Sequence, residues 1–176
     1  MKSDVITISN QGHGFKDAVE QARKVAVYND FDQQKTVALQ LLTEEMLSLA
    51  RSITGEMKAS FWIEVEAGQA ALHMTTNTVM DLEKRNLLIS AATSRKNEAA
   101  TTFLGKLRDS LEQAMLSDKA PDEVPEDVLV DLPHGIYGVS DWDGFEKSIL
   151  RQLADDVKIG IRGNLVEITV SKRFDE

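Results

Sequence analysis

The sequence predicts an α+β protein, a two-layer sandwich in which helices cover one face of a five-strand mixed or antiparallel sheet. Two observations support this prediction. Apolar residues recur every three or four positions in several long segments, as in amphipathic helices, and alternate in short segments, as in strands. Along the chain the segments run strand, two helices, two strands, two helices, connector, helix and two strands. The 176 residues, 42% of them hydrophobic, suffice for one core, so we expect a single domain over 1–176.

The first third of the chain is predicted to form a strand and two helices. Residues 5–8 are a short β run, and an amphipathic helix is expected over 15–28. Asp32 is placed to cap a second helix, over 33–53, which carries a wide apolar stripe. That stripe consists of Leu39, Leu42, Met46, Leu49, Ala50 and Ile53.

Alternating residues predict a pair of strands at 59–66 and 70–78, joined by a turn at Gly68. Trp62 falls on the polar side of the first of these strands. An outward-facing tryptophan is most often covered, so we expect a loop or lid over it. Asp81 is then expected to cap a helix that ends near Ala91.

The middle of the chain reads as a lid-like insertion over about 80–143. A polar loop at 92–97 leads into a helix predicted over 98–116, whose apolar residues we assign to the core: Phe103, Leu107, Leu111 and Met115. All three prolines lie in the acidic stretch 118–133, which is an extended connector, either solvated or an ordered interaction segment.

The last part of the chain is predicted to form a helix followed by a hairpin. Residues 145–157 carry an apolar stripe at helical spacing, and the period then changes from 3.6 to 2. Residues 162–164 supply the Gly-Asn pair that a tight turn needs. The apolar face of this hairpin is expected to lie beneath the 33–53 helix.

Composition narrows the function classes. The net charge of −9 argues against a nucleic-acid or anionic-membrane binder, because both need clustered Lys and Arg. There is no cysteine, no long apolar segment and no secretory signal near Met1, so a cytoplasmic protein is expected. His13, His73 and His134 have no metal-like spacing, and no metal site within the protein is predicted.

The C-terminal residues carry a family resemblance. Leu-Ala-Asp-Asp-Val at 153–157 is followed by a short strand, by Gly163-Asn164 and by Val-x-Ile-x-Val ending near Lys172. This arrangement resembles the end of anti-sigma-factor serine kinases, within the histidine-kinase-like ATPase superfamily. The element order of the whole chain is similar as well. The resemblance implies ATP and Mg²⁺ as cofactors, serine kinase or ATPase chemistry, a protein partner and a homodimer.

The family's long helix carries Glu-x-x-x-Asn, in which Glu acts as base and Asn binds Mg²⁺. Here Thr43-Glu44-Glu45 resembles the lead-in, but Ser48 and Leu49 stand four residues after the glutamates. Glu44 and Glu45 are therefore the candidate catalytic residues and Ser48 a candidate ligand. Glu45 lies nearer the apolar stripe, whereas Glu44 aligns better after Thr43. The alternative is that both are solvated carboxylates.

The family's two other nucleotide-binding motifs are altered in this sequence. Thr76 stands where the family has the adenine-binding Asp of Asp-x-Gly-x-Gly. The phosphate-wrapping Gly-x-Gly-Leu turn retains Gly144 but has Glu146. A substitute phosphate site is the polar loop before a helix, with Ser94, Lys96 and Asn97, although a plain surface loop has the same pattern.

These departures leave three hypotheses. The first is a degenerate histidine-kinase-like ATPase domain that acts as a signalling and regulatory protein-binding module, resembling anti-sigma factors. The second is a genuine ATP-binding protein or serine kinase that has rebuilt its pocket from Glu45, Ser48, Thr76 and residues 94–97. The third is an unrelated α+β domain whose C-terminal residues match by chance.

Overall fold

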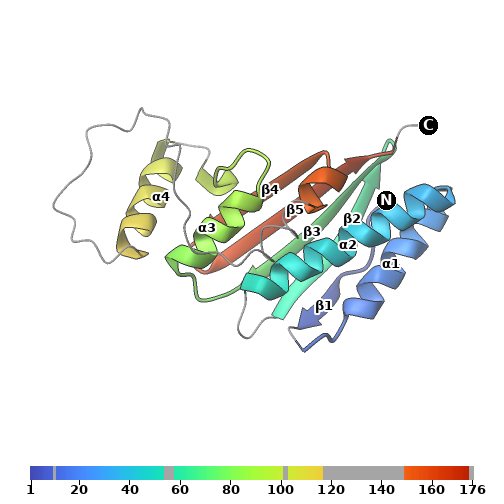
Figure 1. Cartoon of the computed structure of the whole chain (residues 1–176), viewed down its shortest axis with the longest axis horizontal. Coiled ribbons are helices and arrows are strands. Elements are labelled where there is room, and N and C mark those ends of the chain that lie inside the picture. The colour runs from blue at the N-terminus through green and yellow to red at the C-terminus, as the bar shows by residue number, and fades with distance from the viewer. Residues whose placement is uncertain (10, 54–57, 101–102, 117–148, 175–176) are drawn as a thin grey trace.

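An antiparallel sheet of five strands, in the order β1-β2-β3-β5-β4, forms one layer of the protein (Figure 1). The computed structural model describes residues 1–9, 11–53, 58–100, 103–116 and 149–174. The strands are β1 (Ile6–Ser9), β2 (Lys58–Glu66), β3 (Gln69–Asn77), β4 (Asp156–Arg162) and β5 (Leu165–Arg173). The predicted α+β class is confirmed, and of the two sheet types left open the antiparallel one is found.

Helices form the second layer. They are α1 (Phe15–Tyr28), α2 (Gln33–Ile53), α3 (Leu82–Ala91), the 3₁₀ helix η1 (Glu98–Ala100) and α4 (Phe103–Leu116). A further helical segment, residues 149–153, leads into β4. Figure 1 shows α1 and α2 side by side over one part of the sheet, with α4 at the opposite end of the molecule, beyond α3.

The core lies between these two layers. Alternate residues of each long strand are buried on the helix-covered side, as in β2, where Ala59, Phe61, Ile63 and Val65 are buried. The described part of the predicted α2 stripe, Leu39 to Ala50, is buried as well. Val157 and Ile168 of the C-terminal hairpin belong to the same cluster. The hairpin and the 33–53 helix therefore contribute to one core, while the expectation that the hairpin lies beneath this helix stays a prediction.

Capping side chains fix where two helices begin. The Asp32 carboxylate accepts a hydrogen bond from the Lys35 N–H at 2.8 Å, and Asp81 accepts one from the Lys84 N–H at 2.8 Å. Each satisfies a backbone donor that the first helical turn leaves without a partner. Both predicted caps are confirmed.

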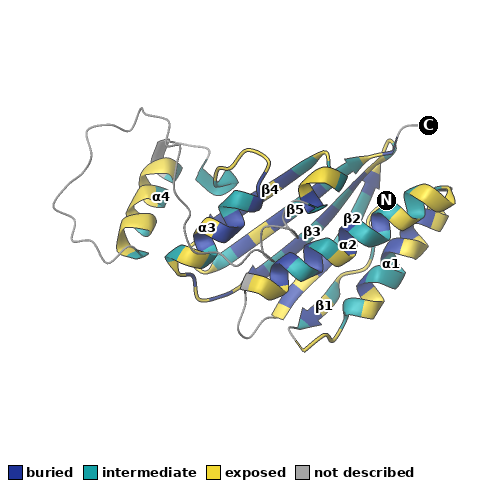
Figure 2. Cartoon of the chain, viewed as in Figure 1, coloured by how far each residue is buried: buried dark blue, intermediate teal, exposed yellow. Residues whose placement is uncertain are grey.

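Two expectations fail in the described residues. The helix expected over 98–116 is divided, with η1 preceding α4. The predicted core residues Leu107, Leu111 and Met115 are exposed, because α4 turns its other side toward the domain (Figure 2). The acidic stretch 118–133 and Gly144 lie outside the described residues.

Trp62 is half-buried on the side of β2 opposite the core residues. Its ring stacks on His73, with centroids 5.1 Å apart, and the Lys2 ammonium lies 4.9 Å from the ring centroid. The Trp62 indole N–H also donates to Glu64. Among the described residues, neighbouring side chains of the sheet and the N-terminus contact this tryptophan, and the loop or lid expected over it stays a prediction.

Gly14 connects β1 to α1 and generates a testable prediction. Its φ is 81°, and a Cβ atom placed there would lie 2.4 Å from the Thr7 carbonyl oxygen. Gly12 has a similar φ of 85°, but a Cβ atom there would meet no atom within 4 Å. We expect Gly12→Ala to lower the free energy of unfolding by about 1 kcal/mol and Gly14→Ala by at least about 2 kcal/mol. Urea denaturation measures both, and equal losses would contradict the close approach of β1 to α1.

Candidate functional site

A cleft lined by basic side chains lies between α3, the 92–97 loop and α4. Its volume is about 410 Å³. Four basic residues line it, namely Arg85, Arg95, Lys96 and Lys106, together with Asn97, Glu98 and Asp109. We call it the basic cleft. It contains two of the three residues of this loop that the sequence marked as candidate phosphate ligands.

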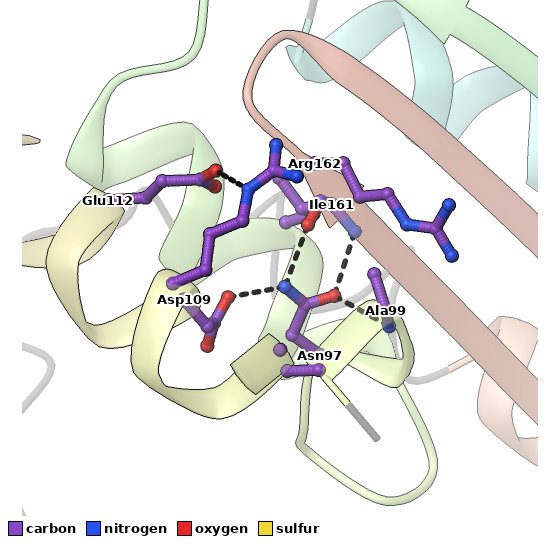
Figure 3. A pocket seen from close by; sticks show the side chains of 9 residues that line it. Asn97, Ala99, Asp109, Glu112, Ile161 and Arg162 are labelled. Carbon is purple, nitrogen blue, oxygen red and sulfur yellow. Dashed lines mark hydrogen bonds and ion pairs between the residues drawn. The ribbon is translucent and has the colours of Figure 1, made fainter. Parts of the chain in front are cut away.

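Asn97 lines both this cleft and the neighbouring pocket drawn in Figure 3, and it binds the edge of the sheet. Its amide nitrogen donates to the Ile161 carbonyl at 2.9 Å, and its amide oxygen accepts from the Ile161 N–H at 2.8 Å. The oxygen also accepts from the Ala99 N–H at 3.1 Å, and the nitrogen donates to Asp109. The amide therefore replaces a neighbouring strand along this part of β4 and has little capacity left for a ligand.

Thr93 performs the same task four residues earlier. Its N–H donates to the Val157 carbonyl at 2.9 Å, and its hydroxyl accepts from the Val157 N–H at 2.8 Å. The 93–97 loop thus satisfies the outward backbone groups at both ends of β4. An edge strand whose donors and acceptors are occupied is protected from pairing with another chain.

A buried ion pair connects α3 to α4. Arg85 is only 3% exposed, and its guanidinium donates to the Asp109 carboxylate. A buried charge without a partner lowers the stability of the fold, so the burial of Arg85 depends on its ion pair with Asp109. Asp109 also accepts from Asn97, so one carboxylate joins the two helices to the loop that binds β4.

Glu112 forms a second connection from α4 to the sheet. One of its oxygens accepts from the Gly163 N–H at 3.1 Å, and the other accepts from Arg108 at 2.7 Å. Burial acts to raise the pKa of Glu112, but the hydrogen bonds from Arg108 and Gly163 outweigh it and hold the pKa below its ordinary value. Glu112 is therefore charged at neutral pH.

Glu44 and Ser48 line a different hollow, a groove of about 420 Å³ between α1 and α2. We call it the α1–α2 groove. Its other lining residues are Phe15, Lys16, Val19, Glu20, Gln40, Leu47 and Arg51. The Arg51 guanidinium lies 5.5 Å from the centroid of the Phe15 ring, so the start of α1 lies beside the end of α2. The basic cleft and the groove share no lining residue.

The other candidate site residues are also separated. Glu45 is half-buried on α2 and does not line the groove that contains Glu44. Thr76 is 2% exposed on the core side of β3, and its hydroxyl donates to the Lys58 carbonyl at 3.2 Å. The Ser94 hydroxyl donates to Glu98 at 2.8 Å. The structure thus brings together Ser94, Lys96 and Asn97 in one loop and places Glu44 and Ser48 along one groove, but it does not join the two groups.

Sequence reasoning missed the residues that hold the basic cleft together. Arg85 and Asp109 are 24 positions apart on different helices, and no local pattern links them. The sequence shows Thr93 only as one residue of a polar loop and does not indicate its contact with β4. An Asn or Thr facing an edge strand leaves no periodic signal, because the contact is made across 64 residues of sequence.

The described residues contain no group of His, Asp or Glu side chains suited to holding a metal ion. None of the helices in this part of the chain is long and apolar enough to cross a membrane. Comparison with protein-family models and with curated proteins finds no match for this chain.

The role of Asn97 at the sheet edge can be tested by removing its amide. Asn97→Ala leaves the N–H and carbonyl of Ile161 without their side-chain partner, so we expect the free energy of unfolding to fall by about 2 kcal/mol. Ser94→Ala is the matched control, since Ser94 is an exposed residue of the same loop, and its cost should stay within about 0.5 kcal/mol. Urea denaturation gives both values. Equal costs would contradict the structural role of Asn97.

Proposed function

We propose that the chain is a cytoplasmic regulatory protein-binding module of the histidine-kinase-like ATPase type, in which the scaffold is kept and the nucleotide site is degenerate. The observation that carries this proposal is the α1–α2 groove. Its floor is apolar, with Phe15, Val19 and Leu47, and its rim is charged. A hollow of this composition between two helices suits the apolar face of an amphipathic helix from a partner protein.

The charges on the rim define the partner further. Lys16 and Arg51 lie at the end of the groove where α1 begins and α2 ends, while Glu20 and Glu44 lie farther along it. A helix with acidic residues at one end and basic residues at the other would match this arrangement in only one direction. Glu44 then has a binding role at the rim, in place of the catalytic role that the sequence indicated.

The placement of the other candidate nucleotide ligands also supports a binding module. Thr76 uses its hydroxyl within the core, and Asn97 uses its amide on β4. A nucleotide held at the 94–97 loop would be on the β4 side of the sheet, whereas Glu44 lies in the groove beside α1. Phosphoryl transfer depends on positioning the phosphate against its base, and this separation opposes it.

One observation favours the second hypothesis, an ATP-binding protein. The basic cleft has room for a polyphosphate, and Arg95 and Lys96 are exposed residues in its wall. If Mg²⁺·ATP bound there, the side chains of the 94–97 loop would donate hydrogen bonds to its phosphates. This alternative predicts nucleotide binding, and the main proposal predicts none.

A thermal-shift titration with Mg²⁺·ATP separates the two functions. A ligand present at a hundred times its Kd raises the free energy of unfolding by about 2.7 kcal/mol. Under the proposed function, millimolar Mg²⁺·ATP leaves the melting temperature of the wild type unchanged. A shift that is lost in Lys96→Ala and kept in Lys24→Ala, a change on α1 outside the cleft, would establish the ATP-binding alternative instead.

The groove is tested by a charge placed on its floor. Val19→Glu should abolish co-purification of the partner protein from extracts of cells that express the chain, because a carboxylate opposes an apolar helix face. Val27→Glu, on the same helix but at an exposed position outside the groove, should retain the partner. Melting temperatures of the two variants check that both are folded. Equal retention of the partner by both would contradict the groove as the binding site.

A further inference from the structure

Helix α4 is amphipathic but faces the domain with its charged side. Asp109 and Glu112 contact Arg85, Asn97 and the Gly163 N–H. On the opposite side, three large apolar side chains are exposed: Leu107 by 59%, Leu111 by 60% and Met115 by 77%. They follow one another at intervals of four residues and form one stripe, which we call the α4 stripe. Figure 2 shows α4 largely in the colour of exposed residues, unlike α2.

The helix cannot simply turn its stripe inward. Rotation would withdraw Asp109 from the buried Arg85 guanidinium and leave that charge without its partner. It would also release the Gly163 N–H and the Asn97 amide. The stripe therefore stays outside the domain, and no described residue covers it. A continuous apolar surface of this kind marks an interaction site.

We propose that a second copy of this chain covers the α4 stripe, with the two α4 helices packed antiparallel about a twofold axis at Leu111. The stripe is centred on Leu111, with Leu107 and Met115 each about 6 Å away along the helix. An antiparallel pair therefore sets Leu111 against Leu111 of the second copy, and Leu107 against Met115 of the second copy. The surface is thus complementary to itself, as an isologous interface requires.

The charges beside the stripe favour the antiparallel direction. Arg108 and Glu112 flank the same side of the stripe and already form an ion pair within one chain. In an antiparallel pair, Arg108 of one copy comes within about 3 Å, measured along the helix axis, of Glu112 of the other. In a parallel pair the two copies of this flank would lie on opposite sides of the interface, so Arg108 would not meet Glu112 of the other copy. The two flanking ion pairs can therefore form across the interface only in the antiparallel direction.

This interface is separate from the α1–α2 groove and does not depend on the proposed function. The stripe lies on α4, at the end of the molecule opposite α1 (Figure 1). Its apolar side chains provide the driving force, so the dimer should persist at about 1 M salt, where exposed ion pairs are screened.

The absence of native cysteine allows a direct test by disulfide crosslinking of the full chain. Leu111→Cys should form a covalent dimer on mild oxidation, since the two copies of this residue meet at the axis. Leu107→Cys alone and Met115→Cys alone should stay uncrosslinked, while a mixture of the two should form a covalent heterodimer. Val27→Cys, equally exposed but on α1, is the control and should not crosslink above background.

Sedimentation equilibrium measures the association itself. The wild type should form a dimer, and Leu111→Glu should raise its dissociation constant at least about tenfold, whereas Val27→Glu should leave it unchanged. A wild type that is monomeric at all concentrations would overturn the proposal, and so would Leu111→Cys crosslinking no faster than Val27→Cys. Self-crosslinking of Leu107→Cys at the rate of Leu111→Cys would overturn the antiparallel arrangement.

Discussion

The arrangement of the β4 side of the molecule depends on the contact between the Asp109 carboxylate and the buried guanidinium of Arg85. A buried arginine must have a counter-charge, and α4 supplies it. This requirement decides which side of α4 faces the domain, and it holds the helix beside η1 and β4. The same carboxylate accepts from Asn97, whose amide occupies the edge of β4. One charge pair therefore joins the walls of the basic cleft, supports the Asn97 contact with the sheet edge and leaves the α4 stripe exposed.

Two of the candidate ligands have a structural role in the folded chain. Asn97 and Thr76 looked like ligands because they are polar residues near places where the resembled family binds nucleotide. In the folded chain their polar groups satisfy backbone atoms of neighbouring strands. Among the described residues, apolar side chains line part of the α1–α2 groove and are exposed on α4. Such surfaces suit recognition of another protein better than transfer of a phosphoryl group.

Most of the fold was predictable, because burial imposes a period on the sequence. The alternation in β2 and the stripe of α2 are each decided by local spacing, and the caps Asp32 and Asp81 are local as well. The direction of α4 was not predictable, because Leu107, Leu111 and Met115 have the same spacing whether they face the core or the solvent. A charge pair between distant positions decided it. The candidate site was predicted only in part, because spacing along α2 does not reveal that Glu44 points toward α1.

Native-state hydrogen exchange at the Gly163 amide tests most directly whether α4 is held by its charged side. This N–H lies in the turn between β4 and β5, where a solvent-exposed amide exchanges rapidly, but here it donates to Glu112 on α4. The account predicts that Gly163 is protected together with Ile161, whose N–H donates to Asn97, and that Asp109→Ala removes both protections. Exchange of Gly163 in the wild type at the rate of a free turn amide would contradict the account, because α4 would then not be bound to the domain through its charged face.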